Sequence, residues 1–443
     1  MQNSMSGKTL LFGYFIIVIL VGSVLLTTPW AWEAPGRLRY LDALFTATSA
    51  VCVTGLIVVD TSEFSLFGTI VIIGLIQAGG LGIIAFGTLL VTGNGRKISL
   101  ANRRLIKEYS IDSVEYEPRR IVRRIIILAL GIEALGAVVL ITAFSHAGAP
   151  TPVLNGIFHA VSAFANAGFS LFDTSLEAFA GNLFVILPII VLLTLGGIGF
   201  VVFMDVTRRA RGLVRVLSLH TRIVLTMTVL LGFTGTLVFF VFEGSTSLSD
   251  LSVSERLLAS FFQAVTPRTA GFNSIPQDTL SMPSQIWTIL LMFVGGAPGS
   301  IAGGVKVTTI VLVFMLAIRR REMHAEIRIG KRSINPVVLN KAASIVIKSL
   351  LILVGAVLVL SVTENWAAEN SFSFMEVLFE TVSAFSTVGL SLGITQQLSD
   401  AGRLIIIAVM FTGRLGIIAM AMPGSEPTKR RFVRYPEGNV LLG

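Results

Sequence analysis

Charged residues are scarce in this sequence. Asp, Glu, Lys and Arg make up only 13% of the 443 residues, about half of the ~25% that is typical of soluble domains. This scarcity excludes an ordinary water-soluble enzyme. Hydrophobic residues make up 53% of the chain and are spread along its whole length instead of collecting into separate cores. The composition therefore predicts a protein whose solvent is the lipid bilayer.

Residues that hold disulfides, metals or nucleotides are also few. Cys52 is the single cysteine and there are four histidines, which excludes a disulfide framework. Neither a Cys-x-x-Cys pair nor a His-Glu-x-x-His string occurs. The chain also lacks a Gly-x-Gly-x-x-Gly and a Walker phosphate loop, so any nucleotide control must come from another polypeptide. We therefore expect no catalytic residues, no organic cofactor and no enzyme activity.

Apolar runs long enough to cross ~30 Å of hydrocarbon occur eight times and come in pairs. The first members lie near Thr9–Thr28, Ile121–Phe144, Thr221–Phe242 and Lys341–Val362, and the second near Thr69–Val91, Leu183–Met204, Gln285–Ile318 and Leu404–Met422. No small-residue cleavage site follows the first run, so we interpret it as a span and not as a signal peptide.

Most of the positive charge is explained by topology. The net charge is +9, and 26 of the 34 basic residues lie in the links between pairs and at the two termini. The links hold nine, five and seven of them, at Gly93–Arg124, Val206–Arg222 and Arg319–Lys341. Because Lys and Arg concentrate on the cytoplasmic side, we expect both termini inside a bacterial plasma membrane, and no nucleic-acid binding.

Four matched segments lie between the members of the pairs. They read FTATSAVCVTG from Phe45, FHAVSAFANAG from Phe158, FFQAVTPRTAG from Phe261 and FETVSAFSTVG from Phe379. Each places a phenylalanine ten residues before a glycine, and the glycines are 113, 103 and 118 residues apart. This in-register spacing indicates four repeats, with expected bounds 1–95, 96–205, 206–320 and 321–443.

Each matched segment begins like a short helix, and Ser252/Glu255 and Ser373/Glu376 have capping-box spacing. About ten helical residues span ~15 Å, half of the membrane core, so the chain must stop midway and return extended. Extended backbone is tolerated there only along a water- or ion-filled path. Four helix C-termini and their carbonyls then favour a cation. The alternative is four re-entrant packing hairpins. The predicted filter comprises Val53, Thr54, Gly55, Asn166, Ala167, Gly168, Thr269, Ala270, Gly271, Thr387, Val388 and Gly389.

The repeat unit contains two complete spans, so every copy enters the membrane in the same direction. We therefore expect an all-α polytopic membrane protein with four parallel helix–pore-loop–helix repeats around a pseudo-fourfold pore axis. Inverted repeats, common in secondary carriers, need an odd number of spans. An even number of spans in each repeat therefore favours a pore over a carrier built from inverted repeats.

Two features of the second spans are candidate gates. Arg414 takes the position of a glycine, since Gly413-Arg414-Leu415-Gly416 matches Gly79-Gly80-Leu81-Gly82. The other cluster glycines are interpreted as packing residues. A charge within a span is costly, so Arg414 is expected to face the interior, either as an electrostatic barrier or as a structural carbonyl clamp.

The second span of repeat 3 contains a glycine- and proline-rich stretch. Glycine and proline at this density disfavour a regular helix. The stretch therefore predicts a broken, mobile segment across the pore, with a static kink as the alternative and Lys306 as its inner anchor. The residues are Gly295, Gly296, Ala297, Pro298, Gly299, Ser300, Ile301, Ala302, Gly303, Gly304 and Lys306.

Four other residues carry weaker predictions. Glu133 lies in an apolar span and is expected to pair with an arginine or lysine, with a proton site as the alternative. His159 is expected to hydrogen-bond within its short helix, and Cys52 to be a packing residue. Arg268 is expected to point behind the filter toward an acidic side chain.

The motifs FQAVTPRTAGFN, ETVSAFSTVGLS, GRLG and the closing RYPEGNVLLG resemble the Trk/Ktr/HKT superfamily of potassium transport proteins, most closely its KtrB membrane subunits. The resemblance covers essentially the whole chain. It implies K⁺ as the permeating ion and filter carbonyls around the four repeat glycines. It also implies the gating roles of the glycine-rich stretch and Arg414, a homodimer, and a cytoplasmic KtrA-like nucleotide-binding ring. The stretch around Pro298 is closer to the Trk than to the Ktr pattern, which leaves gating and Na⁺ dependence open.

Three function classes are candidates for this chain. The first is a K⁺-selective, channel-like uptake subunit driven by membrane potential. The second is a Na⁺- or H⁺-coupled K⁺ symporter of the same fold, with Glu133 or Asp205 in the coupling path. An intramembrane enzyme or a passive scaffold is the third. The matched segments and the lack of an acid–base pair favour the first two.

Overall fold

The structure is a computed structural model that describes residues 7–92, 118–318, 328–329, 332–366, 372–416 and 420. In this part of the chain, five helices are long and apolar enough to cross a membrane. They are α1 (Gly7–Leu26), α3 (Leu66–Thr92), α5 (Pro118–His146), α9 (Leu219–Glu243) and α13 (Pro336–Trp366). A two-stranded antiparallel hairpin of β1 (Arg328–Ile329) and β2 (Arg332–Ser333) is the only sheet among the described residues. The predicted all-α class is confirmed.

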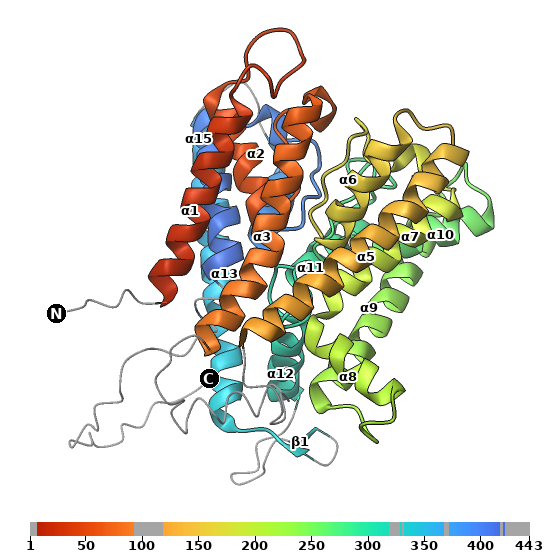
Figure 1. Cartoon of the computed structure of the whole chain (residues 1–443), viewed down its shortest axis with the longest axis vertical. Helices are drawn as coiled ribbons and strands as arrows, with labels where there is room; N and C mark the ends of the chain where they lie inside the picture. The colour runs from red at the N-terminus through yellow and green to blue at the C-terminus, as the bar shows by residue number, and fades with distance from the viewer. Residues whose placement is uncertain are drawn as a thin grey trace, which may run out of the picture.

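Four short helices follow the first span of each repeat. They are α2 (Tyr40–Cys52), α6 (Pro152–Phe164), α10 (Val253–Val265) and α14 (Phe374–Ser386), each of 13 residues. The predicted capping boxes at the starts of α10 and α14 are both present. The 3-10 turns η1 (Thr61–Glu63), η2 (Glu177–Phe179) and η3 (Thr395–Gln397) lie in the return segments. Figure 1 shows α2, α6 and α10 flanked by the longer helices. We call the short helices and their return segments the upper half.

The second spans differ from one another, and we call their lower parts the lower half. In repeat 1, α3 is continuous. In repeat 3, α11 (Met282–Phe293) and α12 (Val307–Ile318) are separated by residues 294–306, here named the mid-span loop. The loop confirms the predicted break in this span.

Two other second spans depart from a regular α-helix. In repeat 2, α7 (Leu183–Ile198) and α8 (Phe200–Ala210) meet at an angle of 100°. Gly199 permits this bend with φ 85°, and the Phe200 amide donates to the Gly299 carbonyl of the mid-span loop. In repeat 4, α15 (Asp400–Phe411) passes into a π-helical turn, η4 (Thr412–Gly416).

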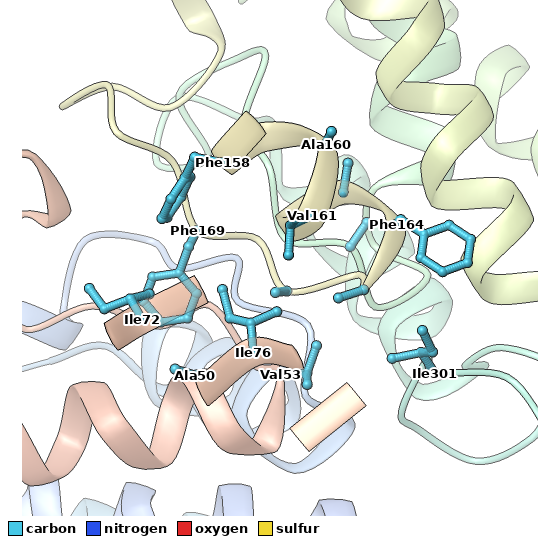
Figure 2. Packing of buried hydrophobic residues seen from close by; sticks show 14 of the residues in the cluster. Ala50, Val53, Ile72, Ile76, Phe158, Ala160, Val161, Phe164, Phe169 and Ile301 are labelled. Carbon is cyan, nitrogen blue, oxygen red and sulfur yellow. The ribbon is translucent and has the colours of Figure 1, made fainter. Parts of the chain in front are cut away.

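The largest apolar core joins repeats 1 and 2. It holds Ala50 and Val53 at the end of α2, Ile76 of α3 and Phe164 of α6, all buried. Figure 2 shows these side chains together with Ile301, which the mid-span loop contributes to the same core. The mid-span loop is therefore packed into the body of the molecule.

Repeat 4 closes against repeat 1. α15 packs on α2, and Arg403 pairs with Asp42 at 2.5 Å. A second pair joins Arg39 to Asp400 at 2.6 Å, exposed at the same edge. The four repeats thus form a closed arrangement, as the fold prediction requires.

Several predicted features lie outside the described residues. They include the two ends of the chain, most of the first basic link, about half of the third, and the motif RYPEGNVLLG. The expected repeat boundaries at 95 and 320 also lie outside them, and the boundary at 205 falls within α8.

Candidate functional site

The four segments that follow the short helices share one backbone conformation. Two residues before each glycine, the chain is left-handed, with φ between 50° and 71°, at Val53, Asn166, Thr269 and Thr387. The glycines Gly55, Gly168, Gly271 and Gly389 have φ between 72° and 98°. Side chains rarely adopt this region, whereas glycine does so freely. The repeated strain at a matched position indicates a conformation imposed by a shared task.

The four glycines form a ring that closes on itself. A Cβ on Gly55 would collide with the Ala167 carbonyl oxygen of repeat 2, and one on Gly168 would lie 2.9 Å from the Ala270 oxygen of repeat 3. In the same sense, a Cβ on Gly271 would strike the Val388 oxygen of repeat 4, and one on Gly389 the Thr54 oxygen of repeat 1. The structure thus brings the four glycines together with Thr54, Ala167, Ala270 and Val388 in one closed ring. The twelve predicted filter residues are the four three-residue segments that end at these glycines. We call this arrangement the glycine ring.

A hydroxyl side chain holds each segment of the ring. Ser49 accepts from the Gly55 amide at 3.0 Å, and Ser383 accepts from the Gly389 amide at 3.1 Å. Ser162 and Thr266 instead donate to the carbonyls of Phe169 and Phe272, at 2.8 and 2.7 Å. Sequence reasoning missed these four residues. Their shared signal is a hydroxyl five or six residues before each glycine.

The electrostatics of the ring suit a cation. Eleven of its twelve residues are buried, and Gly389 is partly exposed. The C-termini of four helices point their partial negative charge toward it. Carbonyl oxygens at such a place can replace the hydration shell of an ion.

The mid-span loop is bonded to two repeats besides its own. Its Ala297 amide donates to the Gly197 carbonyl of repeat 2 at 3.0 Å, and its Gly303 amide donates to Thr269 Oγ1 of repeat 3 at 3.3 Å. Its Ile301 carbonyl accepts from Arg414 of repeat 4 at 2.5 Å. On repeat 1, Ile301 lies against Gly80, where an added Cβ would be 3.1 Å from its side chain. The loop therefore meets all four repeats.

Two cations hold this loop. Arg414 is 3% exposed and makes one hydrogen bond, while its Nε and Nη2 have no partner among the described residues. Lys306 donates to the Ala302 carbonyl at 2.5 Å and so closes the end of the loop on itself. The geometry of Arg414 is compatible with a carbonyl clamp and with an electrostatic barrier.

Glycines in three second spans lie against the ends of the short helices. A Cβ on Gly79, Gly196 or Gly413 would collide with a carbonyl oxygen of Val51, Phe164 or Phe385, respectively. The packing interpretation of these glycines is confirmed.

Two of the weaker predictions hold. His159 is buried and bonds to the Asn155 carbonyl at 2.8 Å and to Ser170 Oγ at 2.9 Å. Cys52 is a buried free thiol in the apolar core.

The prediction for Glu133 was wrong, whereas the acidic partner expected for Arg268 stays a prediction. Glu133 accepts from Gln77 at 2.5 Å instead of pairing with a basic residue, since α5 presents it to the amide side chain on α3. Arg268 has no acidic partner among the described residues. It lines an apolar cavity behind the ring. Asp205 accepts from the Ser218 amide at 2.8 Å, just before α9.

The comparisons with known proteins agree with this geometry. A family model described as TrkH, cation transport protein, matches residues 3–427. The Ktr system potassium uptake protein B of Bacillus subtilis (strain 168) is 39% identical, over 98% of this chain and 96% of its own. The potassium/sodium uptake protein NtpJ of Enterococcus hirae is 36% identical, over 100% of this chain and 98% of its own.

A solved structure shows the same fold. The crystal structure of the potassium transporter TrkH from Vibrio parahaemolyticus matches with a TM-score of 0.75 and 22% identity, over 95% of this chain and 85% of that one. Together with the family match across nearly the whole length, this places the molecule among multi-pass membrane transporters and not among enzymes. The chain belongs to the TrkH family of cation transport proteins.

Proposed function

We propose that this protein is a K⁺-selective, channel-like uptake subunit in which the glycine ring is the selectivity filter. The closure of the ring carries the proposal, because four carbonyl-bearing segments with one conformation surround a single centre. Relatives named as potassium uptake proteins support K⁺ as the ion. Membrane potential would drive uptake with ~2.3 kcal/mol per charge per 100 mV.

The mid-span loop is proposed as the gate of this pore, with Arg414 as its partner. The loop meets all four repeats, so it lies where it can obstruct the path below the ring. A fixed guanidinium beside a cation path adds an electrostatic barrier. Displacement of the loop would open the path.

The family and the charge distribution support a proposal for the assembly and the orientation of the subunit. We propose a homodimer in a bacterial plasma membrane, with both termini cytoplasmic because the basic links and ends favour that side. Relatives named as parts of a Ktr system support a cytoplasmic, KtrA-like nucleotide-binding partner. The name of NtpJ supports a test of Na⁺ dependence.

Selectivity of the purified protein in liposomes tests the filter. Gly271→Ser places a side chain against the Val388 oxygen, so K⁺ flux should fall and the K⁺/Na⁺ flux ratio should drop about tenfold, equivalent to ~1.4 kcal/mol. Gly131→Ser is the control, because nothing lies within 4 Å of an added Cβ on that α5 glycine. An unchanged ratio in Gly271→Ser would reject the filter assignment.

A symporter of the same fold is the second candidate. Glu133 is 4% exposed and one of its carboxyl oxygens has no partner among the described residues, which is a feature of proton-coupling carboxylates in membranes. Reversal potentials separate the two functions. A channel follows the K⁺ gradient alone, whereas a symporter shifts its reversal potential when the Na⁺ or H⁺ gradient changes.

A further inference from the structure

A cavity of about 790 Å³ lies behind the glycine ring, between repeats 2 and 3. Its walls come from α7, α9 and α10, which Figure 1 shows side by side. α10 packs closely on α9, while contact between α7 and α9 is sparse. The volume falls in the ~300–1,000 Å³ range of small-molecule sites.

The cavity opens toward the lipid. Four of its lining side chains, Val229, Phe233, Leu237 and Leu257, are more than half exposed. Its lining extends from Ser254, near the start of α10, to Arg268, just beyond the end of that helix. The 13 residues of α10 rise ~20 Å, so the cavity has the length of an extended acyl chain.

One cation lies at the inner end of this apolar cavity. The Nε of Arg268 is buried without a hydrogen-bond partner, and no residue that the structure describes forms an ion pair with its guanidinium. The lining includes no acidic side chain. An unpaired charge in an apolar site is costly, so the site is complementary to an anion.

We propose that this cavity binds a single-chain fatty acid from the bilayer, with its carboxylate on Arg268 and its tail along α10. A guanidinium matches a carboxylate with two parallel hydrogen bonds. The apolar walls match one unbranched tail. A phospholipid head would instead bury a phosphate and a glycerol against a lining with only a few hydroxyl and amide groups.

The expected effect of this site on K⁺ flux rests on the proposed function, whereas binding of the fatty acid does not. Arg268 directly precedes Thr269 of the ring, and the cavity is also lined by Ala270 of the ring and by Gly296 of the mid-span loop. A positive charge close behind a cation filter opposes occupancy of that filter. A bound carboxylate neutralises the charge, so fatty acid should increase K⁺ flux.

Binding is tested first, without any flux measurement. Purified full-length protein is titrated with radiolabelled oleate by equilibrium dialysis, and oleyl alcohol, which has the same tail without the charge, is the competitor. We expect saturable binding that is about tenfold weaker in Arg268→Gln and that oleyl alcohol competes for poorly. Equal binding by Arg268→Gln, or equal competition by the alcohol, would overturn the proposal.

A second variant keeps the test independent of the arginine. Gly232 lines the cavity, and an added Cβ there meets only Phe261, at 3.8 Å, so Gly232→Leu fills the tail site. Its matched control is Gly355→Leu on α13, where nothing lies within 4 Å. Gly232→Leu should lose oleate binding and Gly355→Leu should keep it. The opposite result would also overturn the proposal.

Flux then tests the consequence. In phosphatidylcholine liposomes, oleate should raise the K⁺ flux of the wild type about twofold or more, but not that of Arg268→Gln, with each protein compared with its own flux without oleate. An Arg268-dependent rise with phosphatidylglycerol alone would reject the single-chain ligand. If no protein conducts K⁺, the proposed function fails, while oleate binding still decides the site.

Discussion

The upper and lower halves of this protein are built from the same four repeats, yet only the upper half is symmetric. Four short helices of equal length end in four left-handed residues and four ring glycines. Below them, one second span is continuous, one bends by 100°, one is broken by a loop and one passes into a π-helical turn. The four repeats therefore share one conformation in the upper half and take four different conformations in the lower half.

The proposed filter and gate give a physical reason for this difference. A ring of carbonyls around one ion needs equal contributions from every side. A gate that obstructs the path, in contrast, can come from one repeat and needs only contacts from the other three. The mid-span loop comes from repeat 3, its carbonyl is held by Arg414 of repeat 4, and Gly197 of repeat 2 accepts from it.

Removal of the mid-span loop, the proposed gate, should have the largest effect and should alter the lower half alone. Deletion of Ala297–Gly303 shortens the mid-span loop and removes its contacts with the other repeats. We expect resting K⁺ flux in liposomes to rise about tenfold or more, the change that ~1.4 kcal/mol of barrier produces. The K⁺/Na⁺ ratio should persist because the glycine ring is intact. Unchanged flux would reject the gate.

Arg414 should have the next largest effect. Arg414→Ala removes both the bond to the Ile301 carbonyl and the fixed charge, so we expect a rise in flux of about three- to tenfold. Arg414→Lys keeps the charge and separates the electrostatic barrier from the carbonyl clamp. Low flux in this variant indicates the barrier, and high flux indicates the clamp. Arg39→Ala, at an exposed pair, is the control.

Two glycines of α3 test the packing between the halves. Gly79 lies against the Val51 carbonyl, whereas Gly74 has nothing within 4 Å of an added Cβ. Gly79→Ala should therefore destabilise the protein by ~1–3 kcal/mol. Gly74→Ala should be neutral or stabilising by up to ~1 kcal/mol, as alanine favours helix. Thermal unfolding in detergent measures both, and equal effects would contradict the assigned packing.

The smallest expected effect concerns pH at the return segments. Burial, and then the charge of Asp278, raise the pKa of Glu177 to about 6. The folded state therefore holds this proton more tightly than the unfolded state, so stability should fall as pH rises from about 4.5 to about 6. We expect a fall in Tm of about 1 °C over this window, absent in Glu177→Gln. Glu63→Gln, in the matching turn of repeat 1, is the control and should keep the same fall in Tm with rising pH.

The symmetric half could be predicted from sequence because periodicity reveals it. A phenylalanine and a glycine ten residues apart recur four times, and the capping boxes mark the starts of two short helices. The broken third span was also visible, since glycine and proline in that density exclude a helix.

The asymmetric details were not predictable because they depend on partners from other repeats. At the bend of Gly199, the next amide donates to the mid-span loop of another repeat, a partner that the local sequence does not reveal. Glu133 was assigned a basic partner from charge alone, but α3 offers the amide of Gln77. Arg268 gave no sign of a cavity, because its lining comes from three helices that are distant in sequence.

The closure of repeat 4 on repeat 1 also bears on how the protein is made. Both ion pairs of this seam join residues 361 positions apart, and Gly389 completes the ring against Thr54. Contacts of such sequence separation form late because loop closure must precede them. A nascent chain released by the ribosome before its last helices are inserted would contain three quarters of a ring and an open side. Truncated products should therefore be silent and open to membrane proteases, and should not form leaky channels.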